Sequence, residues 1–290
     1  MNGAGRAYLT LAVGDRRYLE MAVDLALSLR AWTALPIVLA ADDALAARAD
    51  ASFRGIFTEV VLLQPRFLEG RARKFGVAAV SRFDETLYID SDCIVVSDPS
   101  SLWDAAGGGP LTMAGEMLLP TDSGYHHGFS TRAIIRQLGL RAYFKTNSGV
   151  FHFRREGGRE ALEACLRCHQ DEVRRRLARR FRPWRYLGDE IAFGVVGGRR
   201  GFETFGGPGP MYWADEIRAL DLARPTKPVL HFIAPIPAAT LDGLLEGVVR
   251  RRREAGLSAE GSVEIWRREA RKSGLSWIAN QAIRRMIRSA

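Results

Sequence analysis

Short apolar runs alternate with amphipathic segments through the first hundred residues. We interpret the apolar runs as buried strands, over residues 7–13, 36–41 and 58–63 and in the stretch that ends at Asp90. The segments between them show helical spacing of apolar residues, over residues 18–32, 43–51 and 74–82. Strands that alternate with helices predict a doubly wound, mostly parallel α/β sheet, whose ligands bind at the carboxyl ends of the strands. Asp15, Asp42 and Asp90 all fall at such ends.

The alternation weakens after residue 99. The later pattern predicts loops at residues 107–110 and 120–128, a strand at 145–153, a helix at 159–181 and a strand at 229–233. From Leu241 onward, apolar residues recur at i, i+3, i+4 and i+7 and predict an amphipathic helix. We therefore expect one main domain over residues 1–240 and a helical, basic extension over residues 241–290.

The chain has 290 residues, 47% of them hydrophobic, which is enough for one large or two smaller domains. No apolar run approaches the roughly 18 to 20 residues that cross a bilayer. The first residues do not have the pattern of a signal peptide. Three cysteines, an odd number without an export signal, indicate a reducing compartment. These features predict a cytoplasmic protein.

The formal charge of +9 is concentrated in two places. Residues 250–290 hold eleven arginines and lysines against four glutamates, and seven arginines cluster between residues 174 and 185. Such clusters attract the phosphates of nucleic acid, anionic lipid or a charged acceptor, although solvated helix faces explain them equally well. The sequence has no nucleic-acid-binding motif, so we expect no nucleic-acid partner.

The tail also carries an apolar helical stripe flanked by arginines. The stripe consists of Ile278, Ala282, Ile283, Met286 and Ile287, and the arginines are Arg284, Arg285 and Arg288. This pattern suits a helix that lies on an anionic membrane surface, which predicts a peripheral contact at the inner face of the membrane. Packing of the stripe against the main domain explains it equally well.

Two acidic residues, Asp90 and Asp92, lie two positions apart with apolar runs on both sides. Side chains at i and i+2 of an extended segment point the same way, so both carboxylates can face one cation. Two hard oxygen ligands suit Mg²⁺ or Mn²⁺. A D-x-D triplet occurs by chance in a chain of this composition. Its position at a strand end supports a cation site more than the triplet itself does.

Further polar residues could join this site. Lys74 precedes the acidic pair by one helix and could bind a diphosphate, or it could be a solvated lysine. Asn147-Ser148-Gly149, which we interpret as a turn at the entry of a strand, could face a sugar ring. Asp189 and Glu190 begin a helical run, where acidic residues commonly complement the helix dipole. They could equally face the reacting sugar.

His231 lies in an apolar strand, where a lone histidine usually belongs to the core. A cation at Asp90 and Asp92 would need a third ligand from a separate strand, and an imidazole there would favour Mn²⁺ over Mg²⁺. Residues 165–169 match the C-x-x-C-H signature of covalent haem attachment. The match lies within a helical pattern without an export signal, so we interpret Cys165 and Cys168 as buried apolar residues.

Taken in order, these residues resemble the metal-dependent glycosyltransferases of the GT-A fold, most of all glycosyltransferase family 8. This group includes glycogenin and bacterial lipopolysaccharide galactosyl- and glucosyltransferases, and the resemblance spans roughly residues 7–235. The turn at Val13-Gly14-Asp15, with Tyr18, resembles the segment that binds the nucleotide base in this family. Lys74 resembles the family's basic residue, and Asp90-Ser91-Asp92 resembles its D-x-D. Later in the chain, Asn147-Ser148-Gly149 resembles the Asn-Ala-Gly segment, Asp189-Glu190 the acidic motif and His231 the late histidine.

The resemblance implies transfer of a sugar from a nucleoside diphosphate sugar to an acceptor hydroxyl of a glycan or glycolipid, with retention of configuration and Mn²⁺ or Mg²⁺ as cofactor. It implies metal ligands Asp90, Asp92 and His231, catalytic residues Asp189 and Asn147, and nucleotide-sugar contacts from Val13, Asp15, Tyr18, Lys74, Asp90, Ser91, Ser148 and Glu190.

The chain departs from the family pattern at two points. Family members usually follow the histidine with a Gly and a Lys-Pro-Trp that holds the diphosphate, whereas residues 232–238 contain no lysine. Lys74, Lys145, Arg73 or Arg185 could replace it. Glu190 stands where many members carry Gln.

Two other functions fit parts of the pattern. A sugar-phosphate nucleotidyltransferase shares the early alternation, but it would carry a Gly-rich phosphate loop after the first strand, which residues 13–17 do not provide. A basic, non-enzymatic binding protein on a transferase-like scaffold would bind nucleic acid in a salt-sensitive way without metal.

Overall fold

The computed structural model describes residues 5–68, 72–127, 129–171 and 188–288, with side chains as far as residue 275. The arginine cluster of residues 174–185 and the apolar stripe of residues 278–287 lie outside the residues whose side chains are described. Among the described helices, none is both long and apolar enough to cross a membrane.

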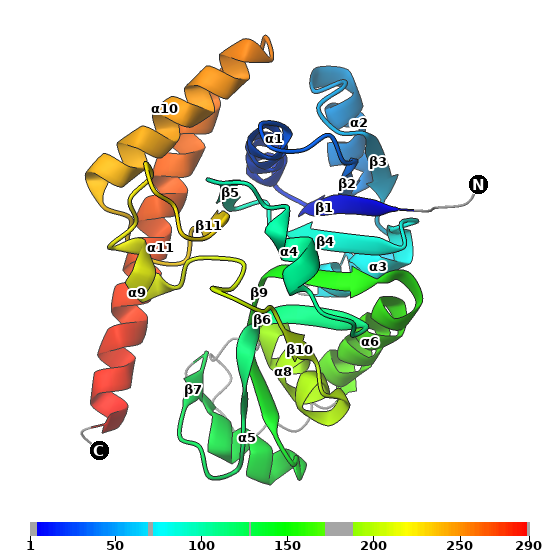
Figure 1. Cartoon of the computed structure of the whole chain (residues 1–290), viewed down its shortest axis with the longest axis vertical. Helices are drawn as coiled ribbons and strands as arrows, with labels where there is room; N and C mark the ends of the chain where they lie inside the picture. The colour runs from blue at the N-terminus through cyan, green and yellow to red at the C-terminus, as the bar shows by residue number, and fades with distance from the viewer. Residues whose placement is uncertain (1–4, 69–71, 128, 172–187, 289–290) are drawn as a thin grey trace.

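A seven-stranded sheet forms the centre of the molecule, with the strand order β10-β6-β9-β4-β1-β2-β3 (Figure 1). Its strands are β1 (Arg6–Ala12), β2 (Ile37–Ala41), β3 (Glu59–Leu62), β4 (Glu85–Ile89), β6 (Leu111–Leu118), β9 (Tyr143–Arg154) and β10 (Glu203–Thr204). β3, β2, β1 and β4 are parallel neighbours, as their alternation with helices predicts. β9 is antiparallel to both β4 and β6. The predicted mostly parallel α/β sheet is confirmed, with one long antiparallel strand inserted in it.

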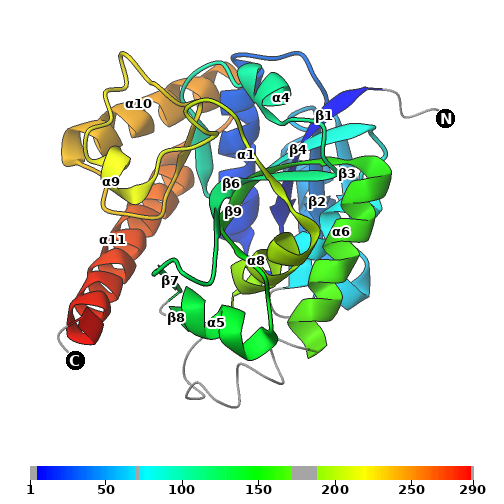
Figure 2. The same cartoon turned by 60° about the horizontal axis from the view of Figure 1, so that its bottom comes forward.

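Helices cover both faces of this sheet (Figure 2). One face packs against α1 (Arg16–Arg30), α2 (Asp43–Ser52) and α4 (Ser101–Ala105). The other packs against the 3₁₀ helices η1 (Pro65–Phe67) and η2 (Ala72–Gly76) and the helices α3 (Val77–Val80), α5 (Thr131–Leu138), α6 (Arg155–Cys168) and α8 (Asp189–Arg200). Neighbouring residues of β1 point to opposite cores, because Ala7 and Leu9 pack on one face and Tyr8 on the other.

Two local predictions differ from the structure. The segment predicted as one helix over residues 74–82 is a 3₁₀ helix followed by a single α-turn. Gly76 lies so close to Phe67 that a Cβ there would come within 2.6 Å of the ring, so the segment is fixed by tertiary packing. The predicted helix from residue 159 begins earlier, at Arg155, and Cys165 and Cys168 are buried in it as expected of small apolar residues.

Two short ribbons lie outside the sheet. β5 (Cys93–Val95) pairs with β11 (Val229–His231), and β7 (Tyr125–His126) pairs with β8 (Phe129–Ser130), each antiparallel. The β5–β11 ribbon leads from the carboxyl end of β4 toward the C-terminal helices.

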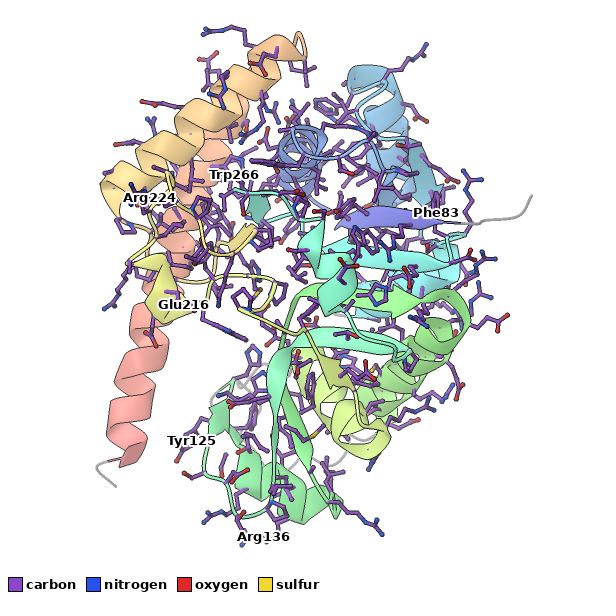
Figure 3. All side chains as sticks on the ribbon, in the orientation of Figure 1. Phe83, Tyr125, Arg136, Glu216, Arg224 and Trp266 are labelled. Atoms are coloured by element: carbon purple, nitrogen blue, oxygen red, sulfur yellow. The ribbon has the colours of Figure 1, made fainter. Side chains whose placement is uncertain are left out.

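The C-terminal helices α10 (Ala238–Glu254) and α11 (Glu260–Arg288), with α9 (Ala214–Ile217), pack beside α1 and the β5–β11 ribbon. Leu244 and Val248 of α10 are buried, as the apolar spacing from Leu241 predicts. Trp266 lies where α11 meets the rest of the protein (Figure 3) and is fully buried. The boundary predicted at residue 240 falls in the first turn of α10 and stays a prediction.

Candidate active site

The carboxyl ends of β1 and β4 meet at one edge of the sheet, because the two strands are parallel neighbours. β4 ends at Ile89, and the chain then turns through Asp90, Ser91 and Asp92 into β5. The amide of Asp90 donates to the carbonyl of Gly149 on β9 (2.8 Å), and the amide of Cys93 donates to the carbonyl of Asp90 (3.1 Å). The acidic pair therefore lies in a turn, and the prediction of an extended segment is wrong.

His231 reaches the acidic pair because the β5–β11 register places it opposite Cys93, the residue after Asp92. Its Nε2 lies 3.3 Å from Oδ1 of Asp92 and 3.9 Å from Oδ2 of Asp90. Two carboxylates and an imidazole from distant parts of the sequence therefore converge. The sequence predicts that an extended segment aims both carboxylates at one site, and in the structure the turn does so.

The electrostatics of this cluster follow from burial and close opposite charges. Burial lowers the pKa of His231, but Asp92 beside it shifts the pKa above its ordinary value. Burial raises the pKa of Asp92, and His231 more than offsets this, so the net shift is downward. The pKa of Asp90 is raised, because burial outweighs the attraction of Lys74. Two carboxylates and one imidazole are a donor set that suits a divalent cation such as Mn²⁺.

Gly149 determines how closely β9 approaches the imidazole. A Cβ at this position would lie 2.5 Å from Nδ1 of His231. That nitrogen is buried and has no hydrogen-bond partner among the described residues. A side chain at residue 149 would therefore displace the histidine from the carboxylates.

Lys74 reaches the site from η2. Its Nζ donates to Oδ2 of Asp90 (2.6 Å) and to Oγ of Ser148 (2.8 Å), and lies 3.5 Å from Oδ2 of Asp189. Burial lowers the pKa of Lys74, but Asp90 and Asp189 raise it above its ordinary value, so the ammonium stays charged. The structure thus brings Lys74 to the acidic pair as a counter-charge, and contact with a diphosphate stays a prediction.

Ser148 links the lysine to the start of α8. Its Oγ donates to Asp189 (3.0 Å) and its amide donates to Oε1 of Glu190 (3.0 Å). Residues 147–149 are not the turn that the sequence predicts, because they lie within β9. The β6–β9 register shifts there, from Met113 opposite Phe151 to Ala114 opposite Asn147. The bulge changes the direction of the strand at residues 147–149, so that Ser148 faces the site.

Asn147 lies on the same bulge. Its Oδ1 accepts a hydrogen bond from the amide of Gly149 (2.8 Å), so the carbonyl end of the side chain is used locally. Ser91, at the centre of the acidic turn, is buried. Asn147 and Ser91, which the sequence predicts as site residues, therefore lie in the two segments that form the site. Their contacts with a sugar or nucleotide stay predictions.

Sequence reasoning missed two histidines that contact Glu190. His126 Nε2 lies 3.2 Å from Oε2 of Glu190, and His127 contacts the same oxygen. Nδ1 of His126 is hydrogen-bonded to the Tyr143 hydroxyl (2.6 Å), which fixes the ring. Burial raises the pKa of Glu190, but the histidines hold it well below its ordinary value. The two histidines lie in a segment that the sequence predicts as a loop. No spacing of nearby residues indicates that they contact Glu190, which is 63 positions from His127.

The predicted nucleoside contacts lie at the end of β1. Asp15 caps α1 by accepting from the amide of Arg17 (2.9 Å), and its side chain remains half exposed. Tyr18 packs under the Arg17 guanidinium, 4.9 Å from the ring centroid. The carbonyl of buried Val13 accepts from Arg73 Nη1 (3.3 Å). The N-cap explains Asp15 without a ligand, and the base-binding role stays a prediction.

Arg73 and Lys74 are consecutive, yet they reach different strands. Arg73 contacts the end of β1 through Val13, and Lys74 contacts Asp90 after β4. The η2 helix thereby places two positive charges along the edge where the predicted nucleotide and metal sites adjoin. Of the other basic candidates, Lys145 pairs with Glu116 (2.8 Å), and Arg185 lies outside the described residues.

No protein family model matches the chain, and no curated protein matches its sequence. Solved structures match it over most of its length. The galactosyltransferase LgtC, solved in complex with donor and acceptor sugar analogs, is 17% identical, with 86% of this chain and 95% of LgtC covered and a TM-score of 0.54. The chain has the GT-A glycosyltransferase fold.

Two further glycosyltransferases support this assignment. The apo form of GlyE from Streptococcus pneumoniae TIGR4 is 13% identical, with 91% of this chain and 64% of GlyE covered and a TM-score of 0.52. The bifunctional glycosyltransferase WbbM, also in apo form, is 15% identical, with 95% of this chain and 52% of WbbM covered and a TM-score of 0.52. The expected fold class is confirmed, and the resemblance to family 8 fits the match with LgtC.

Proposed function

We propose that the protein transfers a sugar from a nucleoside diphosphate sugar, with a UDP-sugar as the expected donor, to an acceptor hydroxyl. The convergence of Asp90, Asp92 and His231 at the carboxyl edge of a GT-A sheet is the observation that carries this proposal. The three matching structures reported above, LgtC, GlyE and WbbM, are glycosyltransferases, which supports sugar transfer in general.

Mn²⁺, or Mg²⁺, is the proposed cofactor, held by Asp90, Asp92 and His231. Such an ion, when bound, neutralises charge that develops on a departing diphosphate. The carboxylates support this proposal, because Asp90 and Asp189 share one ammonium, Lys74, and Asp92 has only the His231 imidazole within ion-pair distance among the described residues. A second source of positive charge would balance them.

The remaining residues would orient the donor and acceptor. Lys74 holds Asp90 and Ser148 in place, and Ser148 in turn fixes Asp189 and Glu190. We propose that Asp189 and Asn147 face the reacting sugar, and that Glu190 replaces the family's Gln as a charged sugar contact. Val13, Asp15 and Tyr18 would contact the nucleoside.

Arg73 is the best-placed replacement for the family's missing phosphate lysine. Its Nη2 would lie 3.7 Å from a Cβ at Gly14, so the guanidinium covers the turn at the end of β1. This turn precedes α1, whose N-terminus also favours an anion. Arg73 and Lys74 would then share the diphosphate between them.

The acceptor is proposed to be a lipopolysaccharide or another cell-surface glycan, and retention is the expected stereochemistry. We also propose a cytoplasmic protein that contacts anionic membrane through its basic C-terminus. A variant that ends at residue 275 keeps buried Trp266 and should bind anionic vesicles more weakly than the full chain. Unchanged vesicle binding would contradict the membrane contact.

Donor binding tests the main proposal most directly. A panel of nucleotide sugars would be measured for hydrolysis and for protection against heat, with and without Mn²⁺. We expect metal-dependent effects for the wild type and for Asp50→Asn, a matched change at an exposed position of α2, and their loss in Asp92→Asn. Identical, metal-independent behaviour of all three proteins would reject the proposal. A sugar phosphate offered with a nucleoside triphosphate tests nucleotidyl transfer in the same assay.

A further inference from the structure

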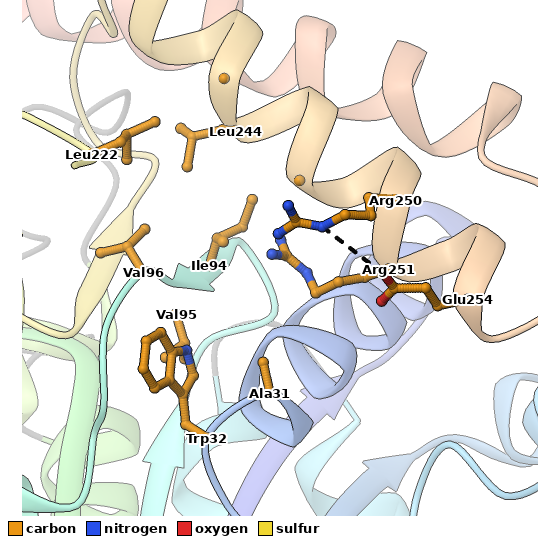
Figure 4. A pocket seen from close by; sticks show the side chains of 12 residues that line it. Ala31, Trp32, Ile94, Val95, Val96, Leu222, Leu244, Arg250, Arg251 and Glu254 are labelled. Carbon is orange, nitrogen blue, oxygen red and sulfur yellow. Dashed lines mark ion pairs between the residues drawn. The ribbon is translucent and has the colours of Figure 1, made fainter.

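A pocket that shares no residue with the candidate active site lies between the end of α1, the β5 segment and α10 (Figure 4). Its volume is about 520 Å³, within the range of about 300–1,000 Å³ that small-molecule sites occupy. Its walls are largely aliphatic and include Ile94, Val96, Leu222 and Leu244. Trp32, about half exposed, lies at the α1 side.

Two arginines give this apolar pocket a positive end. The guanidinium groups of Arg250 and Arg251 lie side by side and point toward the aliphatic residues (Figure 4). Among the described residues that line the pocket, Glu254 is the only acidic one, and its Oε1 lies 4.0 Å from Arg250 Nε. The two arginines therefore carry more positive charge than the lining residues neutralise.

Arg251 has an unmet requirement for an acceptor. Its Nε is buried, and the structure gives it no hydrogen-bond partner among the described residues. Burial, and to a lesser extent the neighbouring Arg250, lower the pKa of the Arg251 guanidinium. Arg252, the next residue, contrasts with it, because Asp24 and Glu20 pair with that guanidinium. A bound anion would satisfy Arg251 in the same way.

Two glycines of α10 keep the pocket open. A Cβ at Gly247 would lie 3.2 Å from Arg251 Nη1, and a Cβ at Gly243 would lie 3.2 Å from Leu222 Cδ1. Neither glycine has a positive φ, so the backbone does not require glycine at either position. Glycine inside a helix costs stability, and here it leaves space where other residues would fill the pocket.

We infer that this pocket binds a phosphate group attached to a short apolar group, with Arg250 and Arg251 on the phosphate and the aliphatic wall against the apolar part. Guanidinium groups bind phosphate oxygens in pairs of hydrogen bonds, which suits two adjacent arginines. The ligand could be a lipid headgroup with its first carbons or a soluble phosphorylated compound. Both have the chemistry that the pocket recognises.

Calorimetric titration of the full-length protein tests this inference with dihexanoyl phosphatidic acid below its micelle concentration. We expect saturable binding at least about tenfold tighter than that of inorganic phosphate or of zwitterionic dihexanoyl phosphocholine. Arg251→Gln should weaken it by about tenfold or more, because a charged hydrogen bond is lost. The matched control Arg253→Gln, exposed on the same helix, should leave it unchanged.

Gly243→Leu offers a second variant that fills the pocket and removes no charge. Loss of binding in this variant, with unchanged urea unfolding, would support the site. Equal affinity for phosphate and phosphatidic acid, or equal weakening by Arg251→Gln and Arg253→Gln, would overturn it. Vesicles that contain phosphatidic acid distinguish the sources: Arg251-dependent vesicle binding supports a lipid, and binding of the monomer alone supports a soluble ligand. Because no donor or metal is present, failure here leaves the proposed transfer reaction untouched.

Discussion

Buried or partly buried charges cluster in two regions of this molecule, and the balance of positive and negative groups differs between them. Where α1 meets α10 and α11, the Arg252 guanidinium lies between Asp24 and Glu20. Ser262 and Trp266 donate to the second oxygen of Asp24. Every carboxylate oxygen of Asp24 has a donor from the protein itself, so this cluster is complete without a ligand.

At the edge of the sheet, carboxylates outnumber the cationic groups that pair with them, although neutral donors such as the Tyr88 hydroxyl also contact them. Asp90, Asp92 and Asp189 surround one lysine and one histidine. Removing a cation from a complete cluster leaves buried charge unpaired, whereas removing an anion from an acidic cluster relieves repulsion. The comparison therefore separates charges that stabilise the fold from charges that are arranged for a ligand.

Arg252→Met should give the largest effect, on stability. The change leaves the buried Asp24 carboxylate without its guanidinium partner, whereas Glu20 keeps its ion pair with Arg16, and we expect the free energy of unfolding to fall by about 3–5 kcal/mol. Urea unfolding followed by circular dichroism measures this. The control Arg253→Met, exposed one position further on, should change it by less than about 0.5 kcal/mol. Similar values for both variants would mean that the Asp24 cluster does not stabilise the interface.

Asp92→Asn should have a large effect on sugar transfer and a small effect on stability, in contrast to Arg252→Met. We expect sugar transfer in saturating Mn²⁺ to fall by about 10²–10³-fold, comparable to removing one charge-stabilising group from an active site. The free energy of unfolding should fall only slightly, because the loss of the Asp92–His231 pair is offset by relief of the repulsion that Asp92 exerts on Asp90. Steady-state kinetics and urea unfolding on the same preparation check both parts. A loss of stability as large as that of Arg252→Met would make the two regions equivalent and contradict the distinction.

His152 is a third case, a buried titratable side chain that lies outside both regions. Both of its ring nitrogens lack hydrogen-bond partners among the described residues, and burial lowers its pKa to about 4. The unfolded chain takes up this proton near pH 6.5 and the folded protein only near pH 4. Stability should therefore fall by up to about 3 kcal/mol as the pH drops through this window.

His152→Phe should remove this part of the pH dependence. The measurement is urea unfolding of both proteins at pH 7.0, 5.5 and 4.5, and the difference between their slopes isolates His152 from other titrating groups. Parallel pH profiles would show that His152 is protonated in the folded protein as readily as in the unfolded chain.

His127→Gln should have the smallest effect. It removes one of the two imidazoles that hold Glu190 and leaves His126 in place. We expect transfer to fall by about tenfold, as for other residues that orient a functional group from behind it. The control Arg136→Gln, at an exposed position of α5 at the bottom of Figure 3, should leave the rate unchanged. An unchanged rate in His127→Gln would show that Glu190 needs no second histidine.

The candidate site shows how far residue spacing carries a prediction. Asp90 and Asp92 were expected to act together because they lie two apart at a strand end, and the structure brings them to His231 through a turn instead of an extended segment. Lys74 was expected to return to the pair, and its ammonium lies 2.6 Å from Asp90. Their grouping could be predicted because each follows or precedes a strand whose position the alternation indicates.

The pairs that the sequence did not predict all join distant segments. His127 contacts Glu190 across 63 positions, and Arg252 pairs with Asp24 across 228. The antiparallel strand β9 and its bulge at residues 147–149 likewise depend on pairing with β4 and β6. No local spacing distinguishes these residues from ordinary loop or helix residues.

The sequence by itself determined the four parallel strands, the helices between them, the polar residues at the strand ends and the amphipathic helix after Leu241. These depend on the period of apolar side chains, which is a local property. Only the tertiary structure decided the position of β9, the histidines at Glu190 and the two kinds of buried charge. Each depends on which distant groups share a dry environment, since a buried charge takes its energy from the partners that packing brings to it.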